Sequence, residues 1–200
     1  NVIGQDTTAY GADLRDDGGP PSLAGLLRDL DALAGLEWIR LLYTYPRRFT
    51  DDLIDAIAEC QHVVAYVDMP LQHISTEILK RMGRGVTRVD IEALLEKLRR
   101  RIPGLVLRTT LIVGFPGETD RQFEELLDFV RTFGFDALGV FGFSPEEGTA
   151  AATMKDQVDE ATIAERVEKL MLAQQEIAFA ASADKVGPSV EILVDGIDPE

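Results

Sequence analysis

The chain has 200 residues, of which 46% are hydrophobic and 28% are charged, as is usual for a protein with one sizeable core. It contains no run of eighteen apolar residues, which excludes a membrane-spanning helix. Thirty-five acidic and twenty basic residues give a net charge of −15. Because such a body repels phosphate backbones, nucleic-acid binding is not expected from this segment, although an acidic surface that serves only solubility explains the charge equally well.

Runs rich in β-branched and aromatic residues alternate along the chain with amphipathic helical patterns. Strands are predicted within Glu37–Pro46, Val63–Leu71, Leu105–Phe115 and Ala137–Pro145, and the opening Asn1–Asp6 reads as the end of a fifth. This order predicts a parallel sheet with helices outside it, either an open doubly wound sheet or part of a barrel. Both architectures place a functional site at the carboxyl ends of the strands.

Helices are predicted where a capping residue precedes a one-sided apolar stripe. The predicted starts are Ser22, Thr50, Ser75, Asp90 and Thr119, and a long final helix runs from about Asp159 to about Ala183. After Lys185 the alternation of Val190, Ile192 and Val194 predicts a strand that opens a second domain. The predicted domains are therefore residues 1–185 and 186–200, and the start of the chain, which lacks Met, reads as the middle of a longer protein.

Unusual residues gather at the predicted strand ends, above all in the turn "GFPGE". Gly114 and Gly117 permit positive φ and leave no side chain to hold a ligand away from the backbone, and Pro116 stiffens the turn between them. A ligand along this edge would meet peptide groups and the N-terminus of the helix after Thr119. The alternative is a tight turn that needs glycine for its geometry alone. The turn resembles neither a Walker loop nor a GxGxxG fingerprint, so nucleoside triphosphates and NAD are poorly supported.

Several single side chains are candidates for chemistry. His73, beside Gln72, follows a strand and is suited to hydrogen bonding or proton transfer, with a structural histidine as the alternative. Arg84 stands between two glycines, where it either clamps a carboxylate or lies in a solvated loop. Arg108 lies in mid-strand and needs a partner, either an internal acidic residue or a ligand carboxylate. Cys60 reads as a small buried hydrophobe, since one thiol forms neither an internal disulfide nor a cysteine-rich metal site.

Five ordered motifs carry a family resemblance: "NVIGQDTTAYG", "IRLLYTYP", "AYVDMPLQHISTEILKRMGRG", "RTTLIVGFPGET" and "LGVFGFSPEEGTAAATM". Together they resemble the radical-SAM methylthiotransferases from Asn1 to about Lys185, and the tail resembles the start of a TRAM domain. The implied fold is α/β: a partial parallel (βα)6 barrel, about strands two to six with outer helices. The implied cofactors are S-adenosylmethionine and [4Fe–4S] clusters, whose chemistry yields a 5′-deoxyadenosyl radical that abstracts hydrogen before sulfur and methyl are installed.

The resemblance also implies roles for residues. Cofactor contact is expected at Gln72, Arg84, Arg108, Gly114, Phe115, Pro116, Gly117, Phe143 and Ser144. Asp6 and His73 are expected on the substrate side, and no catalytic residue is assigned. The family holds its radical-generating cluster through three cysteines spaced CxxxCxxC, whereas this chain has only Cys60. No metal ligand is therefore expected in this chain, the cluster cysteines are expected upstream of Asn1, and the chain alone is expected to be inactive.

Two branches of the family differ in substrate. Asp6, Thr7, His73 and Ile74 match the RimO-type branch, which methylthiolates the β-carbon of an aspartate in protein twelve of the small ribosomal subunit. The MiaB-type branch modifies an adenosine of tRNA and typically reads "LPVQSGS" where this chain reads "MPLQHIS". A cluster-less binding or docking module is a further alternative. The implied partners are the ribosomal protein and a flavodoxin- or ferredoxin-like electron donor, with no membrane, and the implied location is the cytoplasm.

Overall fold

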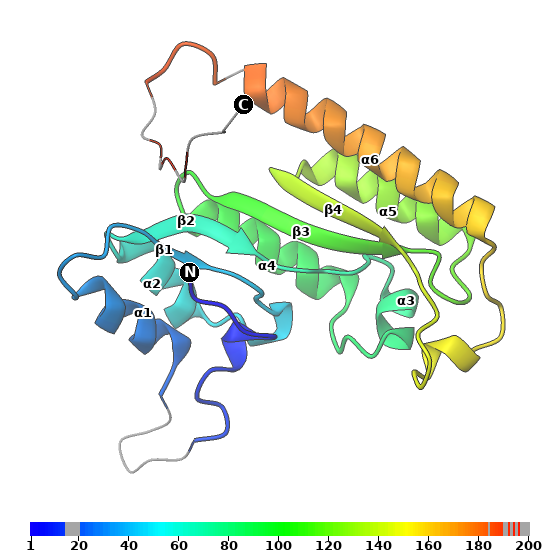
Figure 1. Ribbon diagram of the computed structural model, residues 1–200, viewed down its shortest axis with the longest axis horizontal. Coiled ribbons are helices and arrows are strands. Elements are labelled where there is room, and N and C mark those ends of the chain that lie inside the picture. Colours follow the sequence, from blue (N-terminus) through cyan, green and yellow to red (C-terminus); the bar gives the residue numbers. More distant parts are fainter. Residues whose placement is uncertain (15–20, 184, 190–191, 193, 195, 197–200) are drawn as a thin grey trace.

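The computed structural model describes residues 1–14, 21–183, 185–189, 192, 194 and 196. Four strands form one sheet in the order β1-β2-β3-β4, and all neighbouring strands are parallel (Figure 1). The strands are β1 (Ile39–Leu41), β2 (Val63–Asp68), β3 (Val106–Val113) and β4 (Ala137–Gly142). Each lies within a segment for which the sequence predicts a strand, and the parallel α/β prediction is confirmed.

The predicted strand end at the N-terminus is reduced to one parallel bridge between Val2 and Leu41. The amide of Val2 donates to the carbonyl of Arg40 at 2.8 Å, and the amide of Leu42 donates to the carbonyl of Val2 at 3.0 Å. The segment therefore continues the parallel order beside β1, but its contact is too short to form a strand.

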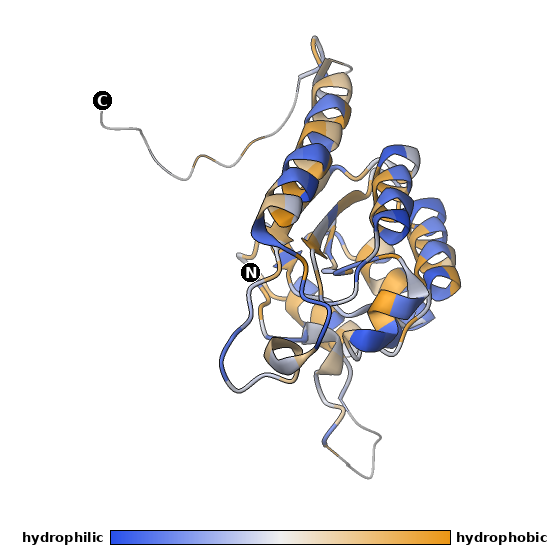
Figure 2. Cartoon of the chain, turned by 90° about the vertical axis from the view of Figure 1, so that its right-hand side faces the viewer, coloured by the Kyte–Doolittle hydropathy of each residue, from blue (hydrophilic) through white to orange (hydrophobic). Residues whose placement is uncertain are grey.

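The sheet alternates with six α-helices in the described part of the chain. They are α1 (Leu23–Asp31), α2 (Asp51–Glu59), α3 (Thr76–Arg81), α4 (Arg88–Arg101), α5 (Asp120–Phe133) and α6 (Glu160–Ala183), with short 3-10 helices at Thr7–Ala9, Pro46–Arg48 and Ala151–Thr153. Figure 2 shows apolar residues along one side of most helices and polar residues along the other, the pattern expected of helices that cover a core.

Local capping chemistry explains where the helices begin. Ser22, Thr50, Ser75 and Thr119 are the N-cap residues that the sequence predicts, and all but Ser75 accept a hydrogen bond from a first-turn amide. The prediction of Asp90 as the start of the next helix was wrong. Helix α4 begins after Thr87, whose hydroxyl accepts from the amide of Asp90, while the Asp90 carboxylate accepts from the amide of Thr87 at 2.8 Å. This reciprocal capping box satisfies two amides that the first turn leaves without partners.

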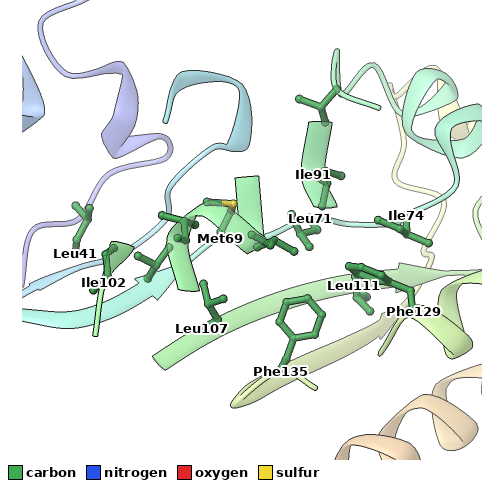
Figure 3. Packing of buried hydrophobic residues seen from close by; sticks show 14 of the residues in the cluster. Leu41, Met69, Leu71, Ile74, Ile91, Ile102, Leu107, Leu111, Phe129 and Phe135 are labelled. Atoms are coloured by element: carbon green, nitrogen blue, oxygen red, sulfur yellow. The ribbon is translucent and has the colours of Figure 1, made fainter. Parts of the chain in front are cut away.

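Strand β3 shows how the two faces of the sheet differ. Its buried positions, among them Leu107 and Leu111, alternate with more exposed ones such as Arg108 and Thr110. Leu107 and Leu111 pack with Phe135 and other residues in the core between the sheet and its helices (Figure 3). Because side chains alternate along a strand, Arg108 and Thr110 project from the opposite face. One face of the sheet is therefore core, and the other is free to form a site.

Helix α6 is joined to the body by polar contacts as well as by packing. The Arg166 guanidinium, which is buried, pairs with Glu118 at 2.9 Å and with Asp120 at 2.7 Å. The amide group of Gln174 donates to the carbonyl of Phe135 at 2.9 Å. The predicted long final helix is confirmed, and these contacts dock it beside β4 and α5 (Figure 1).

The predicted strand after Lys185 falls largely on residues outside the described part of the chain. The division into residues 1–185 and 186–200 therefore stays a prediction. Within the described ranges, none of the helices combines the length and the apolar character that crossing a bilayer requires.

Candidate functional site at the strand ends

A cavity of about 500 Å³ opens at the carboxyl ends of the strands. Four of the residues predicted for the site line it: Asp6, Gln72, Arg84 and Arg108. A larger cavity of about 670 Å³ lies between α4 and α5. Several charged groups of that larger cavity pair with one another, as Arg88 does with Glu92 and Glu125. We take the strand-end cavity as the candidate site, because parallel sheets bind ligands at this edge.

The cavity also contains residues that the sequence analysis did not assign. They are Gln5, Tyr43, Thr44, Tyr45, Pro70, Thr110 and Phe141. Tyr43 and Gln72 are non-glycine residues with positive φ, 56° and 73° respectively. Such backbone is uncommon and often occurs at functional sites. Backbone hydrogen bonds to β3 hold Gln72 in place: its amide donates to the carbonyl of Thr110, and its carbonyl accepts from the amide of Ile112.

Arg84 and Gln72 carry polar atoms without a protein partner. The Arg84 guanidinium donates to the carbonyl of Pro70 at 2.8 Å and lies over the Tyr45 ring at 4.5 Å. Its Nε atom and the Oε1 atom of Gln72 are buried and have no hydrogen-bond partner among the described residues. Burial lowers the pKa of the Arg84 guanidinium, while Tyr45 and Asp6 oppose this shift. Buried polar atoms are normally satisfied, so this donor and this acceptor are free for a ligand.

Arg108 has an internal partner, one of the two possibilities left open by the sequence. Its Nη1 atom lies 2.8 Å from Oδ1 of Asp68, the residue beside it in the β2–β3 register. The Asp68 side chain is 1% exposed, whereas that of Arg108 is 42% exposed. The second carboxylate oxygen of Asp68 accepts from the amide of Tyr43 at 3.4 Å. Asp68 therefore holds the Arg108 guanidinium through Nη1, while the rest of the guanidinium stays available at the cavity.

Asp6 is also paired within the chain. One of its carboxylate oxygens lies 2.9 Å from Nη1 of Arg48, and the other accepts from the hydroxyl of Thr8. The side chain remains 27% exposed and lines the cavity. The structure thus places Asp6 at the candidate site, with its charge compensated.

The "GFPGE" turn lies outside this cavity. None of Gly114, Phe115, Pro116 and Gly117 is among its lining residues. Gly114 and Gly117 have φ of +76° and +79°. A Cβ atom on Gly114 would lie 2.3 Å from Ile163 of α6, and one on Gly117 would lie 1.5 Å from the Arg81 guanidinium. Left-handed backbone and close packing therefore explain both glycines, and the lining of this cavity does not support the predicted contact between turn and cofactor.

The turn is closed by its own acidic residue. The Glu118 carboxylate accepts from the amides of Gly114 and Phe115 at 2.7 and 3.3 Å and pairs with Arg166. Burial raises the pKa of Glu118, while Arg166 and the two amides oppose this shift. The amides that were expected to meet a ligand are thus already bonded inside the protein.

His73 is placed in the interior, not at the cavity. Its ring has no exposed surface, and Nδ1 accepts from the amide of Ser75 at 2.9 Å. Burial, with a contribution from Arg166, lowers its pKa to about 3, so the ring is neutral at physiological pH. Its Nε2 atom lies 3.7 Å from Glu118. These contacts favour the structural histidine that the sequence left as the alternative, and the substrate-side role stays a prediction.

Phe143 and Ser144 also lie outside the cavity. Phe143 packs edge-on against Phe115, with ring centroids 5.3 Å apart, and Ser144 is exposed. Phe141, two residues earlier, lines the cavity instead and is 60% exposed. The cavity thus meets this strand end at Phe141, and the cofactor contact expected at Phe143 and Ser144 stays a prediction.

Cys60 caps the C-terminus of α2 and precedes β2, at the edge of the sheet opposite the cavity. It is half-buried, and burial raises the pKa of its thiol, which makes a reactive thiolate unfavourable. Across the described ranges, no group of three or more His, Cys, Asp or Glu side chains has an arrangement suited to a metal ion.

A parallel sheet covered by helices, with a polar cavity at its strand ends, is the scaffold of a partial (βα) barrel enzyme. Residues 17–130 match the family model of the Radical SAM superfamily, and the chain belongs to this superfamily. Coproporphyrinogen III oxidase from Escherichia coli, described as a radical SAM enzyme, shares the fold with a TM-score of 0.54. The two chains are 23% identical over 73% of this chain and 32% of the other, so this likeness concerns the fold alone.

Curated relatives are considerably more similar in sequence. The chain is 49% identical over all 200 residues to the ribosomal protein uS12 methylthiotransferase RimO of Geotalea uraniireducens, and 50% identical to that of Geobacter sulfurreducens. It is 47% identical to a protein of the same name from Clostridium botulinum, over 98% of this chain. The chain spans less than half the length of these relatives, 44%, 44% and 43% respectively.

Proposed function

We propose that this chain is the S-adenosylmethionine-binding barrel of a cytoplasmic methylthiotransferase that modifies the β-carbon of an aspartate in a small-subunit ribosomal protein. The observation that carries the proposal is an identity of 46–50% to proteins named for that activity on uS12, along essentially the whole chain. The net charge of −15 also favours a basic protein substrate over a nucleic acid.

The strand-end cavity suits S-adenosylmethionine as a ligand. Its volume, about 500 Å³, is within the range of small-molecule sites. The free Nε donor of Arg84 matches the carboxylate of this ligand, and the free Oε1 acceptor of Gln72 matches its ammonium or hydroxyl groups. When bound there, the cofactor supplies the hydrogen-abstracting radical. We assign Arg84 and Gln72 to holding and orienting it, at the end of the cavity that is closed to water.

The iron–sulfur cluster that the superfamily implies does not fit the described residues. A cluster of this kind is held by cysteine thiolates, and the only cysteine is Cys60, at the opposite edge of the sheet. The 200 residues therefore do not supply the three thiolates that such a cluster needs. We assign no step of the reaction to Cys60.

The proposed activity is tested with the full-length protein under anaerobic conditions. It is incubated with S-adenosylmethionine, a reductant, and either the ribosomal protein or tRNA, and both substrates are analysed by mass spectrometry. We expect a methylthio group on one aspartate of the ribosomal protein and unmodified tRNA. Methylthiolated adenosine in tRNA, together with unmodified ribosomal protein, would overturn the proposal.

The cofactor site is tested separately by binding. In the full-length protein, Arg84→Met and Gln72→Leu should each weaken S-adenosylmethionine binding, by roughly 10-fold or more for the charged contact, as measured by equilibrium dialysis. Arg40→Met is the matched control, because Arg40 is exposed and does not line the cavity. Unchanged affinity in both cavity variants would place the cofactor elsewhere.

A further inference from the structure

The candidate cavity has two chemically different ends. Arg84 and Gln72 line it and carry the buried atoms that lack partners, and we call this part its inner end. Arg108, Tyr43 and Phe141 line the same cavity with side chains that are 42%, 47% and 60% exposed. A small cofactor can enter a closed end, whereas a residue of a protein substrate has to approach from the open one. The exposed residues of the cavity, here called its open end, therefore include one cation and two aromatic side chains.

Asp68 holds the cation of the open end in a fixed position. It is the neighbour of Arg108 across the β2–β3 ladder and binds only its Nη1 atom, at 2.8 Å. Among the described residues, Nε and Nη2 of Arg108 have no protein partner, so two donors of the guanidinium remain available. A guanidinium with two free, neighbouring N–H groups matches a carboxylate in a bidentate arrangement.

The charge balance of the cavity also favours an anionic guest. Counted with their ion-pair partners, its charged side chains are three arginines (Arg48, Arg84 and Arg108) and two aspartates (Asp6 and Asp68). The cavity is thus locally positive in a chain of net charge −15. Such a local field attracts a carboxylate more strongly than a neutral amide of the same shape.

We propose that Arg108 is the specificity-determining residue that binds the carboxylate of the substrate aspartate, and that Asp68 is its positioning residue. The inference rests on the proposed function and deepens it. In aspartate the carboxylate is bonded directly to the β-carbon, so a bidentate contact at Arg108 also places the reacting carbon relative to the inner end of the cavity. The sequence analysis expected Arg108 to contact the cofactor, whereas this proposal assigns it to the substrate.

The test compares two peptides on the full-length protein. One carries the target aspartate in its natural sequence, and the other carries asparagine at that position. Binding of each is measured by fluorescence anisotropy in the presence of S-adenosylmethionine and without reductant, so that no turnover is needed. The unmutated protein should bind the aspartate peptide roughly 10-fold more tightly, as expected for a charge-assisted contact.

Removing Arg108 alone leaves Asp68 buried and unpaired, so the main variant is Arg108→Met combined with Asp68→Asn. It should bind both peptides equally while keeping its affinity for S-adenosylmethionine within about 3-fold. Arg108→Lys, which keeps the charge and loses the planar fork, should retain part of the preference. Arg40→Met, an exposed arginine outside the cavity, should retain all of it. A ratio of affinities reports on the substrate carboxylate and is insensitive to a uniform loss of folded protein.

Each result decides the proposal. Loss of the preference only in the Arg108 variants supports it. A preference that survives in the double variant overturns it, as does a double variant that loses cofactor binding to the same extent. If the unmutated enzyme methylthiolates the ribosomal protein but binds both peptides equally, this inference fails and the proposed function stands. If it modifies no aspartate at all, both fail together.

Discussion

The packing of the "GFPGE" turn leads to a quantitative prediction for Gly114→Ala. The residue has φ of +76°, and its new Cβ atom would lie 2.3 Å from Cγ1 and 2.8 Å from Cδ1 of Ile163. The left-handed backbone costs an alanine about 1–2 kcal/mol. Displacing a packed side chain adds about 1–3 kcal/mol. We therefore expect the free energy of unfolding to fall by about 2–5 kcal/mol.

Gly104→Ala is the matched control for this change. Gly104 has φ of +69°, and no atom lies within 4 Å of the position of an added Cβ. It should therefore lose only the backbone contribution, about 1–2 kcal/mol. Urea unfolding of both variants, followed by circular dichroism, gives the difference that belongs to Ile163. Equal losses would refute the packing argument, and a folded Gly114→Ala protein with strongly reduced S-adenosylmethionine affinity would return the turn to the cofactor.

Two further predictions concern buried polar groups, and a third concerns the single thiol. Arg166→Met leaves Glu118 buried without its cation and should lower the free energy of unfolding by about 3–5 kcal/mol, whereas Asp120→Asn, at a 95%-exposed partner, should change it by less than about 1 kcal/mol in the same urea titration. Folding lowers the pKa of His73 from 6.5 to about 3, so its contribution to stability is complete above about pH 6.5 and is lost as the pH falls towards 3. Unfolding titrations across this range should show that loss in the unmutated protein and not in His73→Asn; equal slopes would contradict a neutral His73. The chain alone, reconstituted with iron and sulfide and given dithionite, should form no 5′-deoxyadenosine, because Cys60 is its only thiol; product above a no-protein control would contradict this.

Much of the fold could be predicted because it depends on local chemistry. The four strands are short apolar runs bounded by turn residues, and four of the helix starts carry a side chain suited to capping. The one misplaced start has a specific cause. Asp90 has a capping side chain, but it belongs to the third helical position, where it bonds back to Thr87. Two capping residues three positions apart are ambiguous until the backbone shows which is extended.

The site could be predicted only in part. The local sequence indicates where a strand ends, but it does not show in which direction the side chains near that end point. Gln72 was assigned from its position after a strand, Arg84 from its place between two glycines and Arg108 from its place in mid-strand, and all three line the cavity. Phe143 was chosen over Phe141, although both have the same parity along the strand. Gly142 is the last residue of β4, and the amide of Phe143 still donates to the carbonyl of Val113 in β3 at 2.8 Å, while the Phe143 ring packs on Phe115. Two positions along one strand thus separate a residue that lines the cavity from one that packs against the turn.

The "GFPGE" turn shows why an unusual motif need not mark ligand contact. Cβ atoms on Gly114 and Gly117 would meet Ile163 of α6 and Arg81. Glu118 accepts from the amide of Gly114 and in turn pairs with Arg166 of α6. His73, from the loop after β2, lies against the same carboxylate. The turn therefore joins three distant segments at one buried junction, and its bare backbone makes room for a helix. The cavity, in contrast, is lined by ordinary-looking residues whose significance lies in atoms left without partners, Nε of Arg84 and Oε1 of Gln72. Nε2 of His73 and Oε1 of Gln174 are also buried without a partner among the described residues, so such atoms suggest a ligand site only where, as at Arg84 and Gln72, their residues line a cavity.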